Sequence, residues 1–207
     1  KAEIEARFPK LLRKVAGYNL DHLGPPHANA AHLLVGSEGT LAYSERLHLK
    51  LSRIAAQRAL GVCHFPKFYT AMELTQHIVK LGPSAVELVD RTMIGLAREI
   101  PAFEKTVAAF IRGEPDAVLL VEFSGENNQG PKLKHLVQLM ADLGLPGSVV
   151  EITDDKLQKQ VWEVRKAGLN IMMSMKGDGK PVSFIEDCAV PLEHLADYTD
   201  RLNQVFE

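Results

Sequence analysis

The residues best suited to chemistry are two glycines that flank a small hydroxyl residue. The run consists of Gly36, Ser37, Glu38, Gly39, Thr40 and Leu41. Glycine lets the backbone approach a ligand closely, and a tight turn leaves amide N–H groups available to an anion. Such a run can form a site for a phosphate-bearing cofactor. A plain hairpin turn needs the same glycines, so the spacing alone leaves both interpretations open.

The cysteines and histidines provide no ligand set for zinc or for an iron–sulphur cluster. The chain has no Cys-x-x-Cys and no His-x-x-x-His pattern. Cys63 and Cys188 stand alone in apolar runs, where we expect buried thiols in a reducing, cytoplasmic compartment. His22, His27 and His32 lie near one loop, but their spacing fits no ligand pair on a helix or strand. We therefore expect no metal site.

The composition is that of a globular protein and excludes several classes of function. Of the 207 residues, 46% are hydrophobic and 24% are charged, and the net charge is −2. This charge argues against a nucleic-acid partner. No apolar run approaches the roughly 20 residues of a membrane-spanning helix. The chain begins at Lys1 and ends at Glu207 inside helical patterns, so we expect a piece of a longer protein.

The elements around the glycine run predict strand, turn and strand. Residues 32–36 and 44–52 have the apolar or alternating pattern of short strands. Before them, residues 2–15 have a helical pattern that Pro9 should interrupt. A change of pattern near residue 54 predicts a first domain of residues 1–54 and a second of residues 55–207.

The second domain alternates short strands with helices. Strands are expected at residues 56–65, 85–89, 117–123, 149–152 and 182–185. Helices are expected at residues 68–81, 93–100, 103–111, 133–143, 156–167 and 191–206. These short elements favour an α+β fold, in which helices pack on one face of a mainly antiparallel sheet.

Five motifs, in order, resemble one group of flavoproteins. GYNL at residues 17–20 and LVGSEGTL at 34–41 resemble the end of the FAD-binding domain of the vanillyl-alcohol-oxidase type. VEFSG at 121–125, WEVRKAG at 162–168 and FIEDCAVP at 184–191 resemble the cap domain of the glycolate oxidase, D-lactate dehydrogenase and D-2-hydroxyglutarate dehydrogenase branch. The last motif is similar to the large bacterial versions fused to an iron–sulphur domain. The resemblance covers nearly the whole chain.

This resemblance implies an FAD-dependent enzyme that oxidises a 2-hydroxy acid to the 2-oxo acid, of the D-lactate, glycolate or D-2-hydroxyglutarate class. Electrons would pass to an acceptor, through iron–sulphur clusters in the fused members. The implied FAD contacts are Tyr18, Asn19, Gly36, Ser37, Glu38, Gly39, Thr40 and Leu41. For Glu38 a turn-stabilising role is equally compatible, because a carboxylate beside a pyrophosphate is unfavourable unless it points away.

Arg165 matches an arginine that binds the substrate carboxylate in hydroxyglutarate-type relatives, and a guanidinium suits a carboxylate. A solvated arginine at a helix end is the alternative. Leu169 stands where those relatives have a hydroxyl residue, and residues 185–187 replace their Lys-Tyr-Asp. The second carboxylate clamp is then either missing or supplied from elsewhere, and Lys176 or Lys180 could supply it. An exposed hairpin tip is the alternative for that turn.

The resemblance also implies that essential groups lie outside this chain. The catalytic base and the metal-binding histidines are expected downstream of Glu207, and the pyrophosphate-binding half of the FAD domain is expected before Lys1. We therefore expect the fragment alone to be inactive and to hold FAD weakly or not at all. We expect a cytoplasmic location, with peripheral membrane contact through the electron acceptor. The competing interpretation is a stand-alone α+β ligand-binding or regulatory module without redox chemistry, which has no need of the glycine run.

Overall fold

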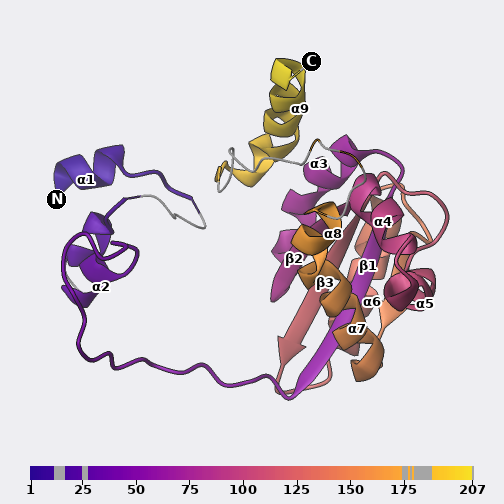
Figure 1. Cartoon of the computed structure of the whole chain (residues 1–207), viewed down its shortest axis with the longest axis horizontal. Helices are drawn as coiled ribbons and strands as arrows, with labels where there is room; N and C mark the ends of the chain where they lie inside the picture. Colours follow the sequence, from indigo (N-terminus) through magenta and orange to yellow (C-terminus); the bar gives the residue numbers. More distant parts are fainter. Residues whose placement is uncertain (12–16, 25–27, 174–176, 178, 180–187, 207) are drawn as a thin grey trace. The chain divides into compact units, whose positions relative to one another are not determined.

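The computed structural model describes residues 1–11, 17–24, 28–173, 177, 179 and 188–206. The chain divides into two compact units (Figure 1). The first comprises Lys1–Arg53 and Phe184–Pro191, and the second comprises Ile54–Ser183 and Leu192–Glu207. The assignment of residues 1–54 to an FAD-binding domain, and of residues 55–207 to a cap, stays a prediction.

The first unit contains three short helical segments. They are α1 (Ala2–Arg7), the 3-10 helix η1 (Leu20–Leu23) and α2 (Ala31–Leu34). Helix α1 ends at Arg7, and the backbone of the next residue, Phe8, is extended, because the helical conformation is disfavoured for a residue that precedes a proline. The expected interruption at Pro9 is confirmed.

The prediction of two strands around the glycine run is wrong. Residues 31–34 form helix α2, and residues 42–53 form neither helix nor strand. A strand needs a neighbour to satisfy its backbone N–H and C=O groups, and the described part of this unit contains no sheet. Leu47, Leu49 and Leu51 consequently remain 69%, 78% and 87% exposed.

The second unit is built on a four-stranded antiparallel sheet of order β2-β3-β1-β4 (Figure 1). Its strands are β1 (Gln57–Phe65), β2 (Ala85–Asp90), β3 (Ala117–Gly125) and β4 (Val149–Ile152). They confirm the antiparallel α+β fold and four of the predicted strands. The fifth, at residues 182–185, lies outside the described residues.

Helices connect these strands. They are α3 (Phe68–Ile78), α4 (Arg91–Arg98), α5 (Pro101–Phe110), α6 (Gly130–Asp142), α7 (Asp155–Lys166), α8 (Gly168–Met173) and α9 (Leu195–Phe206), with the 3-10 helices η2 (Val79–Leu81) and η3 (Leu192–His194). The predicted helices are confirmed, whereas α8 is an addition: the pattern predicts a helix that stops at Ala167. Every helix in the described part of the chain is too short or too polar to traverse a lipid bilayer.

Helices cover both faces of the sheet, which corrects the expectation of one covered face. On one face, Leu60 and Val62 of β1 pack in a core with α4, α5, α7 and α8. On the other, Cys63 and Phe65 pack with α3, α6 and α9. The reason is visible in the continuous apolar runs of β1 at residues 59–63 and of β3 at residues 117–121, because a run without alternation must be buried on both faces of the sheet.

The two cysteines differ in their surroundings. Cys63 is fully buried in β1 as expected, and burial raises the pKa of its thiol to about 12. Cys188 is exposed, so the expectation of burial is wrong for this residue. Its segment, residues 188–190, forms no strand and therefore gives it no sheet face to pack against.

Candidate functional site

The glycine turn (residues 36–41) adopts the backbone that its composition favours. Gly36, Glu38 and Gly39 have positive φ angles of 80°, 53° and 75°. Within the described residues, the amides of Glu38 and Gly39 have no hydrogen-bond acceptor. Apart from Gly39 and its two chain neighbours, no atom of the described residues lies within 4 Å of the place where a Cβ of Gly39 would be. The turn thus offers open backbone and free amides, which fit the close approach of a flavin or a phosphate.

Side chains brace this turn from within. The Ser37 hydroxyl donates to the Leu34 carbonyl oxygen at 2.9 Å, and the Thr40 hydroxyl donates to the Ser37 carbonyl oxygen at 2.6 Å. The Tyr18 hydroxyl lies 2.9 Å from Oγ1 of Thr40, so it must be the donor there. The sequence-predicted residues Tyr18, Ser37 and Thr40 are therefore in direct contact.

Asn19 supports the same turn from the loop before it. Its Nδ2 donates to the carbonyl oxygens of Val35 at 2.9 Å and His32 at 3.3 Å. Glu38 is exposed, and its two proposed roles, as an FAD contact and as a turn-stabilising acceptor, both stay predictions. All predicted FAD contacts lie in or against this turn, with Leu41 at its end. Their contact with FAD stays a prediction.

Arg165, in the last turn of α7, forms an ion pair with the sheet of the second unit. Its Nη2 donates to Oε2 of Glu87 on β2 at 2.8 Å, and its Nε donates to the same oxygen at 3.2 Å. The side chains of Arg165 and Glu87 are 42% and 40% exposed. A pair this exposed contributes at most about 1 kcal/mol to stability. Arg165 is therefore at a helix end, as the alternative interpretation requires, but its guanidinium is held in place.

Trp162, one turn earlier on α7, is anchored in a parallel way. Its Nε1 donates to Oε2 of Glu122 on β3 at 2.9 Å, and the hydroxyl of Ser84 donates to Oε1 of Glu122 at 3.1 Å. The register pairs Ala85 with Glu122, so Glu122 and Glu87 are diagonal neighbours on the sheet face that α7 covers. Both residues of the Trp-x-x-Arg motif therefore bind a sheet glutamate.

Sequence analysis misses Glu87 and Glu122. The available signal is an acidic residue between apolar neighbours inside a strand, as Glu87 is between Val86 and Leu88 in β2. Such a residue needs a partner when it faces a packed helix. The pattern does not say which cation or donor provides that partner.

A pocket of about 400 Å³ lies beside Arg165. It is lined by Phe68, Leu88, Val89, Asp90, Met93, Arg165, Gly168, Leu169 and Met172. A Cβ at Gly168 would lie 3.9 Å from Nη1 of Arg165, so Nη1 points towards this pocket wall. Oδ1 of Asp90 accepts the Met93 amide at 2.8 Å and caps α4. The pocket therefore offers a guanidinium edge in mainly apolar surroundings, which suits a small organic carboxylate.

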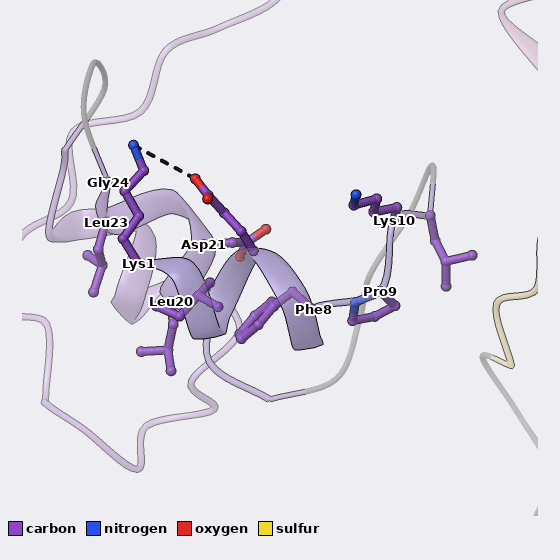
Figure 2. Close-up of a pocket in the computed structure, with 11 residues that line it drawn as sticks. Lys1, Phe8, Pro9, Lys10, Leu20, Asp21, Leu23 and Gly24 are labelled. Atoms are coloured by element: carbon purple, nitrogen blue, oxygen red, sulfur yellow. Dashed lines mark ion pairs between the residues drawn. The ribbon is translucent and has the colours of Figure 1, made fainter.

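Two other hollows offer less chemistry. One of about 670 Å³ lies beside Trp162 and has acidic and basic side chains in its wall, including Arg58, Lys159 and Glu163. The other, of about 810 Å³, lies in the first unit between α1 and η1 (Figure 2). Lys1 and Glu5 form an exposed ion pair at 3.8 Å there. Neither hollow gathers side chains around one reacting position.

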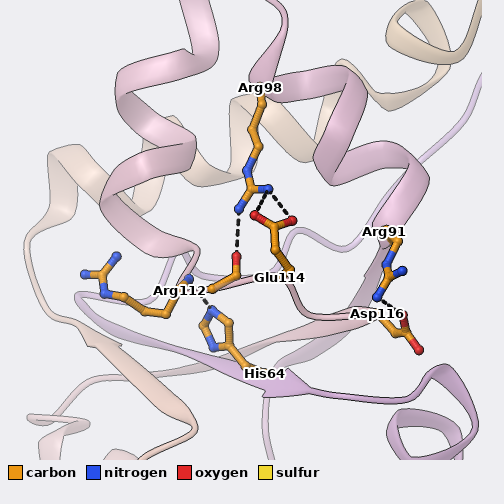
Figure 3. A network of polar contacts seen from close by, with 7 residues as sticks. His64, Arg91, Arg98, Arg112, Glu114 and Asp116 are labelled. Carbon is orange, nitrogen blue, oxygen red and sulfur yellow. Dashed lines mark hydrogen bonds and ion pairs between the residues drawn. The ribbon is translucent and has the colours of Figure 1, made fainter.

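A network of polar contacts around His64 in the second unit holds that part of the fold together (Figure 3). Nδ1 of His64 lies 3.0 Å and 2.9 Å from the carbonyl oxygens of Val62 and Ser148, and Nε2 accepts the Arg112 amide at 3.1 Å. Burial, and to a smaller extent the charge of Arg112, lowers the pKa of His64. These bonds fix a neutral imidazole with both nitrogens engaged, so His64 is a packed histidine and not a base.

Some predicted positions lie outside the described residues. They are Lys176, Lys180, His27 and residues 185–187. In the described part of the chain, the rings of His22 and His32 stack at 5.1 Å. No group of three His, Cys, Asp or Glu residues that could hold a metal ion occurs in that part.

Comparison with known proteins identifies the family. The model of the C-terminal domain of FAD-linked oxidases matches residues 54–207. D-2-hydroxyglutarate dehydrogenase of Pantoea ananatis is 32% identical over 93% of this chain and 20% of that protein. The D-2-hydroxyglutarate dehydrogenase of Escherichia coli is 31% identical over 92% of this chain and 20% of that protein. Mitochondrial cytochrome D-lactate dehydrogenase of Arabidopsis thaliana is 26% identical over 91% and 30%. The chain thus spans 20% to 30% of the length of these relatives, and it belongs to the FAD-linked oxidases.

Proposed function

We propose that this chain is part of a flavoenzyme that oxidises a 2-hydroxy acid, of the D-lactate, glycolate or D-2-hydroxyglutarate class, to the 2-oxo acid. The observation that carries this proposal is the Arg165 guanidinium at the wall of a mainly apolar pocket. Membership of the FAD-linked oxidases and the names of the relatives support it. The competing interpretation, a regulatory module without redox chemistry, has no such support.

The bound FAD would supply the redox chemistry, since a flavin accepts the hydride equivalent released from C2 of a hydroxy acid. The residues proposed to hold it are Tyr18, Asn19, Gly36, Ser37, Glu38, Gly39, Thr40 and Leu41. The glycines would let the ring or the phosphates approach the backbone. The free amides of Glu38 and Gly39 would donate to a ligand oxygen.

Arg165 is proposed to bind the substrate carboxylate and so to fix the position of the neighbouring C2. Lys180 is proposed as a second cation for the substrate. The base that removes the hydroxyl proton is proposed to lie beyond Glu207. We further propose that the electrons pass to an acceptor, with an iron–sulphur cluster that lies outside this chain. The proposed location is cytoplasmic, with peripheral membrane contact. The exposed Cys188 thiol fits a reducing compartment.

The test uses the flavin-loaded protein that contains this chain, with D-lactate, glycolate and D-2-hydroxyglutarate as substrates. Arg165→Ala is expected to raise KM about 10- to 100-fold with flavin still bound, because a charge-assisted contact is lost. Arg98→Ala is the control, since Arg98 forms a comparable pair with Glu114, at 2.7 and 2.8 Å, outside the pocket wall (Figure 3).

Two results contradict the proposal at different levels. A colourless protein that cannot be reconstituted with FAD, or one that oxidises none of the three acids, contradicts the activity. An unchanged KM in an active Arg165→Ala enzyme removes Arg165 from the substrate site and leaves the activity standing.

A further inference from the structure

Glu87 occupies one edge of the Arg165 guanidinium and leaves another edge available. Its Oε2 accepts from both Nε and Nη2, at 3.2 and 2.8 Å. Nη1 takes no part in this contact and lies towards Gly168, which belongs to the pocket wall. The ion pair thus engages the Nε–Nη2 edge of the guanidinium, while Nη1 lies beside Gly168 of the pocket lining.

We propose that Glu87 is a positioning residue for substrate binding: it holds Arg165 in the orientation that receives the substrate carboxylate. This inference rests on the proposed function of Arg165. An arginine side chain has many rotamers, and immobilising one when the substrate arrives weakens binding. Because Glu87 is fixed on strand β2, the entropy cost of ordering the arginine side chain is met when the protein folds and not when the substrate binds. The arginine is then already oriented in the free enzyme.

The position of helix α7 does not depend on Glu87. Val161 and Val164 of α7 are buried in the core against the sheet, at 0% and 3% exposure. The bond between Trp162 and Glu122 forms a second tether one turn away. Loss of the Glu87 carboxylate should therefore loosen the Arg165 side chain and leave the helix in place.

Glu122 provides a matched control for this inference. It lies on the neighbouring strand, faces the same helix and accepts from a side chain of the same motif, but it does not contact Arg165. Glu122→Ala leaves the half-buried indole N–H of Trp162 without its partner, so it should destabilise the protein at least as much as Glu87→Ala. A purely structural effect should therefore be as large in Glu122→Ala.

The experiment measures KM and kcat for the best 2-hydroxy acid in the flavin-loaded protein, with melting temperature and flavin content as checks. Glu87→Ala is expected to raise KM about three- to fivefold, with kcat changed less than about twofold, because a pair worth at most about 1 kcal/mol can change the population of the oriented arginine by no more than about fivefold. Glu122→Ala is expected to leave KM within about twofold. In an Arg165→Ala background, Glu87→Ala should have no further effect on KM, because its only route to the substrate is then gone. Glu87→Gln, which keeps an oxygen acceptor, gives the same test if the alanine variant does not fold, with a smaller rise in KM.

An unchanged or lower KM in the Glu87 variants would overturn the inference, and a lower value would identify Glu87 as a competitor of the substrate. An equal rise in the Glu87 and Glu122 variants would also overturn it, since the effect would then be structural. Failure of the wild-type protein to oxidise any 2-hydroxy acid would instead contradict the proposed function, so the two failures are distinguishable.

Discussion

Replacing Gly61 by alanine is expected to destabilise the second unit, although alanine usually stabilises regular structure relative to glycine. Gly61 lies in the middle of β1, where α6 packs on the sheet. A Cβ atom at this position would lie 2.5 Å from Cδ2 of Leu136 and 3.0 Å from Cδ1 of Leu133. Both leucines are at most 1% exposed, so neither can move aside without displacing its own neighbours.

The magnitude follows from two opposing effects. Forcing an extra methyl group into a packed core costs about 1–3 kcal/mol. The reduced backbone freedom of alanine in the unfolded chain returns about 0.5–1 kcal/mol. The net free energy of unfolding should therefore fall by about 1 kcal/mol, near the middle of a range from zero to about 2.5 kcal/mol, which corresponds to a decrease in Tm of about 2–4 °C for a unit of this size.

Thermal and urea unfolding, followed by circular dichroism, measure this effect. Gly95→Ala is the control, because Gly95 lies in α4 and, apart from its chain neighbours and the surrounding helix backbone, no atom of the described residues lies within 4 Å of its Cβ position. The same substitution should there stabilise the protein by up to about 1 kcal/mol. A Gly61→Ala protein at least as stable as the wild type would refute the reasoning, since α6 would then be able to move away from β1 without cost.

Two further measurements test the environments of single side chains. The lowered pKa of His64 means that the unfolded chain takes up a proton near pH 6.5 that the folded protein does not. As the pH is lowered below about 6.5, the free energy of unfolding should therefore decrease, by at most about 1.4 kcal/mol per pH unit from this group. His64→Gln should remove that part of the pH dependence. An identical pH dependence in the variant would contradict the prediction. A thiol reagent should modify Cys188 in the native protein and reach Cys63 only on unfolding, because burial raises the pKa of Cys63 to about 12. Peptide mass spectrometry checks this, and fast native modification of Cys63 would disprove it.

The second unit is predictable from sequence because its signals are local. The run from Ala117 to Phe123 is apolar at nearly every position and forms β3. Asp154 is followed by a helical pattern and does cap α7, with its Oδ1 2.8 Å from the Leu157 amide. In each case the residues that determine the element lie inside it or next to it.

The first unit shows where such signals fail. Residues 47–51 alternate between leucine and polar residues, which is typical of a strand, yet they form none. Alternation specifies which side chains would share a face, whereas a strand also needs a partner for its backbone groups. The turn at Gly36 and Gly39 was predictable, because positive φ angles depend on the glycines themselves.

The candidate site combines both situations. The part of the site that lies on α7 can be predicted from the sequence, since Trp162 and Arg165 are three residues apart and must lie on one face of the helix. The other part cannot, because Glu87 and Glu122 are 35 residues apart in sequence and become neighbours only through the register that pairs Ala85 with Glu122. A shift of β2 by one residue would turn Glu87 to the opposite face of the sheet and release Arg165. A relative that has the Trp-x-x-Arg motif is therefore expected to hold its arginine in the same orientation only if it also has an acidic residue at the position of Glu87 and the same register of β2 on β3.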